Sequence, residues 1–315
     1  MTPILFYDLP FGITTIDVQC FRQNFAGSHL IIEGDSAAFV DVGTSFSASL
    51  LLEGLAIKRI PRENVEYVIV THIHLDHAGG AGELMSHLPN AKFVVHPRGA
   101  RHMIDPQKLI NAAIDVYGVD RVKEDYGNII PIPKERVIEA EDGLSVDMNG
   151  RTFLFLDTPG HAKHHVCVFD ERSQGIFTGD AFGLSYRELD TDRGAFILPT
   201  TSPAHFAPEA MRQSVKKIMS YRPQNIFFTH FSHVTNVPHL VDDFLRRLDQ
   251  FLELGQQLKN HGKERHALFV QGMGDFLLSE LKQHGSTLSE KEALEVLAVD
   301  LELSTQGIEI WLDQH

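Results

Sequence analysis

The sequence predicts a mixed α/β fold followed by an all-helical region. Short β-rich runs separated by glycine-containing turns fill the first 70 residues. Further β-rich runs alternate with helical patterns up to about residue 235, without a regular repeat of βαβ units. From about residue 236 onward, apolar residues recur only at helical spacing. We therefore predict a domain of residues 1–235 and a C-terminal helical extension of residues 236–315.

The expected elements of the first domain follow one another along the chain. Runs rich in β-branched and aromatic residues predict strands at 13–18, 29–32, 37–42, 68–70, 92–95, 137–138, 144–146, 152–156, 165–170, 175–178 and 225–228. Apolar residues at helical spacing predict helices at 47–56 and 79–87, and within 97–126. No internal repeat or low-complexity tract interrupts this order.

Several amphipathic helices are expected in the extension. Ser289 and Glu292 have the spacing of a capping box, which marks the start of a helix. Ile308, Trp311 and Leu312 predict a separate short helix at the end of the chain.

An apolar stripe of Phe244, Leu248 and Phe251, with Trp311 at the end, suggests a role for the extension. We expect it to cover the edge of the active site, to form a homodimer contact, or both. Ordinary packing on the first domain is the alternative.

Composition sets limits on the class of protein. The chain has 315 residues, of which 43% are hydrophobic, enough for a large core. Its formal net charge is −14, from 42 acidic against 28 basic residues. Because phosphate contacts dominate affinity for nucleic acid, this balance argues against DNA or RNA as partner and favours a small-molecule substrate.

The cysteines and the apolar segments of the chain bear on its redox chemistry and its cellular location. The two cysteines, Cys20 and Cys167, are too few for a disulfide framework. The N-terminus lacks a basic stretch followed by a long apolar one, so no secretory signal is expected. No segment approaches the roughly 18 apolar residues of a membrane span. We expect a cytoplasmic protein that makes no contact with a membrane.

Four metal-ligand side chains fall within six positions directly after an apolar run. His72, His74, Asp76 and His77 follow Val68–Val70, which has the character of a buried strand. Imidazole and carboxylate are ligands for divalent metals. Alternation along an extended backbone places His72 and His74 on one side. Asp76 and His77 lie one step into the turn and are suited to a second ion.

Three later strands each end in one further ligand-type residue. His161 follows a strand and a Pro-Gly turn, Asp180 follows a strand and a glycine, and His230 ends a strand after Thr229. Alone, each is the kind of residue that caps a turn or satisfies a structural contact. Together they allow a rigid sheet to bring ligands from distant parts of the sequence into one site.

These motifs resemble those of the metallo-β-lactamase superfamily, over roughly residues 10–235. The resemblance implies a four-layer αββα sandwich with a binuclear metal site at one edge. It also implies the ligands: His72, His74 and His161 for one ion, Asp76, His77 and His230 for the other, and Asp180 bridging both. No cysteine replaces a ligand as in many β-lactamases, which makes antibiotic hydrolysis an unexpected activity.

The expected chemistry is hydrolysis by a hydroxide shared between two metal ions. Metal lowers the pKa of bound water to about 7, and one ion can also polarise a carbonyl or phosphoryl oxygen. Asp76 is the expected catalytic residue that orients the hydroxide and carries its proton. Zinc is the expected metal, with iron and manganese as alternatives, because histidine and carboxylate suit all three.

Residues around the expected site are candidates for the pocket. His164 stands where many relatives have glycine and could line the site, with exposure on the surface as the alternative. Asp41 resembles a buried aspartate that supports metal ligands in the superfamily, with capping of a turn as the alternative. Phe182 and Tyr186 follow the bridging aspartate, and Tyr186 is a candidate oxyanion donor. Packing in the core is an equal alternative for both. Gly183 occupies the position of a tyrosine that is typical of quorum-quenching lactonases.

The leading hypothesis is a hydrolase of a small ester, thioester, lactone or phosphodiester. An RNA-processing nuclease fits the acidic charge poorly, and a glyoxalase-II-type thioesterase lacks a clear basic cluster in the extension. A di-iron redox or gas-sensing protein on the same scaffold is a further alternative, as is a metal-bound signalling module without activity. The intact His72 and His74 pair favours hydrolysis.

Overall fold

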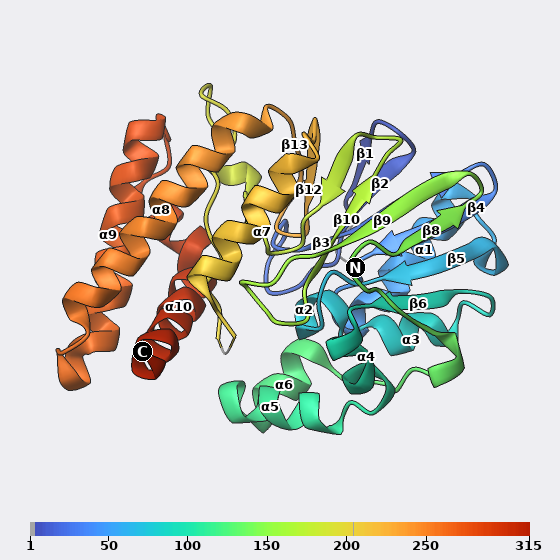
Figure 1. Ribbon diagram of the computed structural model, residues 1–315, viewed down its shortest axis with the longest axis horizontal. Coiled ribbons are helices and arrows are strands. Elements are labelled where there is room, and N and C mark those ends of the chain that lie inside the picture. The colour runs from blue at the N-terminus through green and yellow to red at the C-terminus, as the bar shows by residue number, and fades with distance from the viewer. Residues whose placement is uncertain (1–3, 204) are drawn as a thin grey trace. The chain divides into compact units, whose positions relative to one another are not determined.

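Two sheets make up most of one part of the chain, and helices make up most of the other (Figure 1). The computed structural model describes residues 4–203 and 205–315. Its backbone divides into two compact units. The first unit holds the residues up to Asp157 with His164–Gly179 and Pro223–Thr235, and the second holds Thr158–Lys163, Asp180–Arg222 and Asn236–His315. The predicted α/β class with a helical C-terminal region is confirmed.

The first sheet has seven strands within the described residues, in spatial order β1-β2-β3-β4-β5-β6-β7. These are β1 (Phe6–Leu9), β2 (Ile13–Asp17), β3 (Gly27–Glu33), β4 (Ser36–Val40), β5 (Val65–Ile69), β6 (Lys92–Val95) and β7 (Val137–Glu139). Strands β1 to β4 pair antiparallel, and β4 to β7 pair parallel. Because parallel neighbours share a direction, β4, β5 and β6 all end at one edge, which is where the candidate metal ligands begin.

The second sheet has six strands in the described part of the chain, in spatial order β13-β12-β11-β10-β9-β8. These are β8 (Ser145–Met148), β9 (Arg151–Asp157), β10 (Val166–Asp170), β11 (Gly175–Phe177), β12 (Asn225–Phe228) and β13 (Ser232–Val234). Strands β11 and β12 are parallel, and the other pairs are antiparallel. The ends of β11 and β12 therefore also meet at one edge.

The faces of the two sheets share one core. Side chains alternate along β4, so that Ala38 and Val40 join a cluster with Phe155 of β9 and Phe177 of β11. Glycine allows α1 to pack closely against the first sheet: a Cβ on Gly54 would lie 2.6 Å from the side chain of Ile16. The sheet is therefore buried on both faces, which explains why its central strands are almost wholly apolar.

Helices of the first unit lie between the strands in sequence, as the apolar spacing predicts. They are α1 (Ala48–Lys58), α2 (Leu75–Ala78), α3 (Ala81–Ser86), α4 (Pro97–Ile104), α5 (Gln107–Tyr117) and α6 (Val119–Tyr126). Short 3₁₀ turns lie at Ser45–Ser47, Arg62–Asn64 and Lys134–Arg136 in the first unit, and at Arg187–Leu189 and Gly262–Glu264 in the second.

The second unit is built around four helices among the described residues. These are α7 (Pro208–Ser220), α8 (Val237–Leu258), α9 (Arg265–His284) and α10 (Glu290–Gln314). The predicted capping box is present at the start of α10, where the hydroxyl of Ser289 accepts from the backbone of Glu292. The prediction of a separate last helix at Ile308–Leu312 is wrong, because α10 continues unbroken through Gly307.

The predicted division after residue 235 stays a prediction. A border between the two compact units does fall between Thr235 and Asn236, but the second unit also takes in two earlier stretches. The apolar stripe of Phe244, Leu248 and Phe251 is buried within the single chain. Phe244 packs on Phe182, with ring centroids 5.4 Å apart. The three residues of the stripe are therefore not available on the surface for a dimer contact, and the homodimer remains an expectation.

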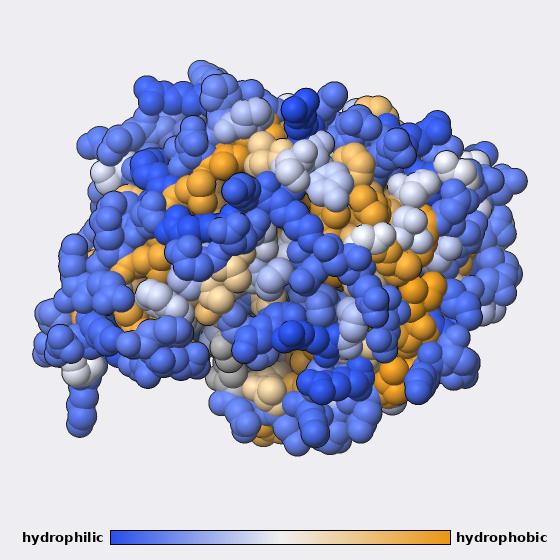
Figure 2. Space-filling model, viewed as in Figure 1, coloured by the Kyte–Doolittle hydropathy of each residue, from blue (hydrophilic) through white to orange (hydrophobic). Residues whose placement is uncertain are grey.

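Hydrophilic residues cover most of the molecular face seen in Figure 2, in keeping with the net charge of −14. Within the described residues, no helix combines the length and apolarity that crossing a membrane requires.

A buried histidine links the two sheets of the first unit. The Nε2 of His29 lies 3.1 Å from the carbonyl oxygen of Phe228, and its Nδ1 lies 3.1 Å from the hydroxyl of Thr15. A carbonyl only accepts, so Nε2 donates and Nδ1 accepts from Thr15. Burial lowers the pKa of His29 to about 4, against the opposing effect of the Phe228 bond.

We expect the protein to lose stability in acid, because His29 is buried as a neutral imidazole. Its ordinary pKa is 6.5, so the unfolded chain binds more protons than the folded chain between about pH 6.5 and pH 4. The free energy of unfolding should fall as pH falls through that window. Denaturant unfolding of metal-free protein measures it, and His29→Gln, which cannot titrate, should show a shallower fall. Equal slopes for both proteins would contradict the assignment.

Candidate metal centre

The candidate ligands of the first sheet lie directly after β5. Val70 still pairs with the neighbouring strand through its backbone, donating to Val94 at 3.0 Å, and the chain then turns. His72 and His74 stand side by side in this turn, with Nε2 of His72 2.9 Å from Nδ1 of His74. The carbonyl of His74 begins helix α2 by accepting from Ala78 at 2.9 Å. The short helix then carries Asp76 and His77.

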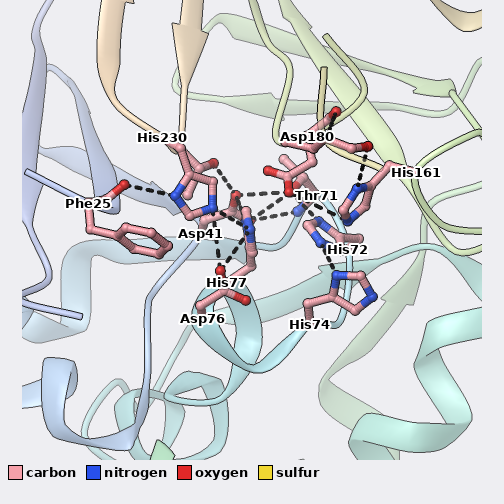
Figure 3. A network of polar contacts seen from close by, with 12 residues as sticks. Phe25, Asp41, Thr71, His72, His74, Asp76, His77, His161, Asp180 and His230 are labelled. Atoms are coloured by element: carbon pink, nitrogen blue, oxygen red, sulfur yellow. Dashed lines mark hydrogen bonds and ion pairs between the residues drawn. The ribbon is translucent and has the colours of Figure 1, made fainter. Parts of the chain in front are cut away.

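Asp76, His77 and His230 form a convergent group of metal-type ligands in the first unit (Figure 3). Their ligand atoms lie within 4.8 Å of one another. The Oδ2 of Asp76 is 3.6 Å from Nε2 of His77 and 3.4 Å from Nε2 of His230. The two Nε2 atoms are 3.2 Å apart. Two nitrogens and one carboxylate oxygen aimed at one point are a suitable donor set for zinc, iron or manganese.

Asp41 supports this group by accepting hydrogen bonds from four donors. Its carboxylate accepts from His77 Nδ1 at 2.8 Å, from the backbone nitrogen and hydroxyl of Thr71 at 2.8 and 2.9 Å, and from the hydroxyl of Thr229 at 2.5 Å. Because Nδ1 of His77 donates to Asp41, its Nε2 is left as the ligand atom. The expected supporting role of Asp41 thus has a direct structural basis.

The charge state of Asp41 follows from these contacts. Full burial would raise the pKa of its carboxyl, but the charge and hydrogen bond of His77, with the bonds from Thr229 and Thr71, hold it below its ordinary value. The same holds for the pKa of Asp76, where burial is outweighed by His77 and His230. Both aspartates are therefore carboxylates at neutral pH.

The second nitrogen of His230 is also occupied. Its Nδ1 donates to the carbonyl oxygen of Phe25 at 2.8 Å, and the ring of Phe25 packs edge-on against it at 4.8 Å. This leaves Nε2 directed at Asp76 and His77. A backbone carbonyl carries no sequence signature, so the sequence did not indicate this partner.

His161 and Asp180 lie together in the second unit. Nε2 of His161 is 3.5 Å from Oδ2 of Asp180, and both side chains are almost fully buried. The Nδ1 of His161 lies 3.4 Å from the carbonyl oxygen of Thr200. The hydroxyl of Thr200 donates to the carbonyl oxygen of Asp180 at 2.8 Å. Thr200 thus contacts both residues, a role that the sequence did not indicate.

Two further histidines surround the His72 and His74 pair. The ring of His165 stacks on His72, with centroids 5.0 Å apart, and His164 packs edge-on against His74 at 5.6 Å. A glycine is required beside them: Gly179 has φ +46°, and a Cβ there would lie 2.4 Å from the hydroxyl of Thr71. His164 thus contacts the rings of two candidate ligands, and its place in a substrate pocket stays a prediction.

Tyr186 and Phe182 are fully buried in the second unit. The hydroxyl of Tyr186 donates to the carboxylate of Asp300 on α10, at 3.1 Å. Phe182 packs on α8 through Phe244. The catalytic role of Tyr186 stays a prediction, and it requires the hydroxyl to exchange Asp300 for a substrate oxygen.

Gly183 fills a position that has no room for a side chain. Its φ is +73°, and a Cβ would lie 1.9 Å from the carbonyl oxygen of Leu198. A tyrosine of the lactonase kind cannot be accommodated in this turn as it stands.

Comparisons with known proteins agree with this arrangement. The chain combines a two-sheet α/β fold with candidate histidine and aspartate ligands at strand ends, which places it among α/β proteins with a candidate metal site. A family model, the metallo-beta-lactamase superfamily, matches residues 25–230, more than half of the chain. The protein belongs to this superfamily, and the expected fold is confirmed.

Individual relatives are distant. The metallo-beta-lactamase fold-containing protein ST1585 of Sulfurisphaera tokodaii is 26% identical over 194 residues, 59% of this chain and 67% of ST1585. The crystal structure of ST1585 matches with a TM-score of 0.65 at 22% identity, covering 94% of this chain and 98% of that one. TTHA1429 of Thermus thermophilus matches with a TM-score of 0.63 at 16% identity, covering 99% and 93%.

Two of the curated relatives are named as thioesterases. An atrochrysone carboxyl ACP thioesterase of Aspergillus chevalieri is 25% identical over 180 residues, which cover 56% of this chain. The match spans 46% of that enzyme, less than half of its length.

Proposed function

We propose that this protein is a binuclear metal-dependent hydrolase of a small ester, thioester, lactone or phosphodiester. The observation that carries the proposal is the convergence of Asp76, His77 and His230, each ligand atom within 4.8 Å of the others. Asp41 and Phe25 hold the outer nitrogens of the two histidines. Such preorganisation is typical of a metal site and is not needed for packing alone.

Asp76, His77 and His230 would hold one metal ion. The second ion would be held by His72, His74 and His161, and both ions would share Asp180 as a ligand. Chain connectivity supports this assembly. Asp180 directly follows Gly179, which belongs to the first unit and lies against Thr71. The stretch Thr158–Lys163, which carries His161, is bounded on both sides by residues of the first unit.

The reaction depends on this chain's own groups once metal is bound. The metal ions would supply polarisation of the scissile bond and a water of lowered pKa. Asp76 would orient that water and accept its proton, since its carboxylate is ionised at neutral pH and stands beside His77 and His230. No serine or cysteine nucleophile is required.

Thioesters are the first substrates to test, because two relatives are named as ACP thioesterases. The crowded Gly183 turn makes a lactonase-type tyrosine impossible at that position. Zinc is the proposed metal, and iron and manganese are the alternatives.

The test is metal removal and return. We expect chelator-treated protein to lose hydrolysis of every substrate, and zinc to restore it together with two bound ions per chain. The panel is an acyl thioester, an aryl ester, a lactone and an aryl phosphodiester, with zinc, iron(II) and manganese(II) compared. If metal-replete protein hydrolyses none of these substrates and shows an oxidisable di-iron spectrum, the hydrolase proposal is contradicted and a di-iron redox protein takes its place.

A further inference from the structure

We propose that the C-terminal helices position metal ligands through the segment Phe196–Thr201, and that Thr200, Thr201 and Gly307 are the positioning residues. The inference rests on the proposed binuclear function. It assigns to α10 a part in the metal centre in place of a separate appendage. Every contact that carries it lies within the second unit.

Thr200 contacts both ligands of this unit. Its hydroxyl donates to the backbone carbonyl of Asp180 at 2.8 Å, and its own carbonyl faces Nδ1 of His161 at 3.4 Å. The carbonyl contact selects the tautomer in which Nε2 of His161 is the ligand atom. The position of Thr200 therefore sets the position of two candidate ligands at once.

Thr201, the next residue, is seated on α10. Its hydroxyl donates to the carbonyl oxygen of Ser304 at 3.0 Å. The helix approaches so closely that a Cβ on Gly307 would lie 1.6 Å from the carbonyl oxygen of Thr201. Glycine destabilises a helix interior relative to alanine, so close approach is the physical reason for it here.

Helix α8 holds the beginning of the same segment. Arg247 is buried, donates to the carbonyl of Ile197 at 2.7 Å, and places its guanidinium 3.8 Å from the ring centre of Phe196. Glu280 of α9 accepts from Arg247 at 3.2 Å, which balances the buried charge. The segment is thus held at its beginning by the side chain of Arg247 and at its end by the backbone of α10.

The segment has little regular structure of its own. Between Asp180 and α7, the described residues contain only the 3₁₀ turn Arg187–Leu189 and isolated bridges such as Leu184 with Leu198. A metal ligand must be held to within about 0.5 Å of its working position. The helices supply this restraint, because the segment cannot supply it alone.

The main experiment compares Gly307→Ala with Gly274→Ala. Both glycines lie in helices of the second unit, but a Cβ on Gly274 first meets the flexible end of Leu294, at 3.3 Å. We expect Gly307→Ala to displace Thr201 and weaken binding of one ion by about 10–100-fold, leaving one ion at Asp76, His77 and His230. Gly274→Ala should bind two ions as the wild type does.

The readouts are cobalt(II) stoichiometry, competition with a chromophoric chelator, and the visible spectrum of the cobalt protein. Thermal unfolding of the metal-free proteins separates loss of metal from loss of fold. If Gly307→Ala binds both ions like Gly274→Ala, the inference is overturned. If the wild type itself binds fewer than two ions, the proposed binuclear function fails first.

A second pair of variants decides the matter if Gly307→Ala does not fold. Thr200→Val keeps the shape of the side chain and removes the hydroxyl that holds Asp180, whereas Thr200→Ser keeps the hydroxyl. We expect the valine variant to show weakened binding and an altered cobalt spectrum, and the serine variant to restore both. Normal metal binding in the valine variant would contradict the role of Thr200.

Discussion

Replacing Asp76 by asparagine is expected to lower kcat by about 10²–10⁴-fold, the range that a positioned acid–base group contributes. The carboxylate stands 3.6 Å from Nε2 of His77 and 3.4 Å from Nε2 of His230. An amide has the same shape but accepts no proton and binds metal poorly. Asp76→Asn should therefore lose activity and one metal ion together.

Asp157→Asn is a matched control for Asp76→Asn. Asp157 also pairs with a histidine, His96, with its Oδ1 3.2 Å from Nε2, and its side chain is 43% exposed. We expect wild-type kcat and two bound ions for this control. Steady-state kinetics with the best substrate of the panel, and metal analysis of the same samples, measure both. An Asp76→Asn enzyme with wild-type kcat would remove this residue from the mechanism.

Replacing Asp41 by asparagine is the second change with a large expected effect. The carboxylate accepts from His77, Thr71 and Thr229, and an amide offers a single acceptor oxygen to the same donors. Leaving buried donors unsatisfied costs about 1–3 kcal/mol each. His77 should also lose its fixed orientation, and metal affinity should fall about 10–100-fold.

Asp170→Asn separates the two effects of the Asp41 change. Asp170 is buried in the same unit and accepts from Arg151 at 3.0 Å and from the hydroxyl of Ser173. We expect this control to lower the free energy of unfolding without changing metal affinity. Denaturant unfolding of metal-free protein and zinc competition are the measurements. A loss of zinc affinity as large in Asp170→Asn would show that Asp41 acts through stability alone.

The sequence indicated most of the fold because its local patterns agree with the final structure. Strands buried on both faces are apolar throughout, and helices show a spacing of three to four residues. The separate last helix predicted at Ile308 was wrong, because α10 continues through Gly307 although glycine disfavours a helix interior. The tertiary structure explains this glycine, because a Cβ there would meet the backbone of Thr201.

The candidate ligands could be proposed from sequence because metal chemistry admits few side chains. Histidine and aspartate at four strand ends narrow the choice to a specific set. The supporting contacts could not be proposed in the same way. Every residue has a backbone carbonyl, so nothing in the sequence marks those of Phe25 and Thr200 as partners of the candidate ligands. A lone threonine such as Thr200 is also ordinary in any loop.

The sequence alone therefore determined which residues are able to bind metal and which family of fold carries them. Only the tertiary structure decided which atoms face the site. Asp41 and Phe25 take one nitrogen each of His77 and His230, and Tyr186 is turned to Asp300. The physical reason is that ligand identity is a property of single residues, whereas orientation depends on hydrogen bonds between segments far apart in the chain.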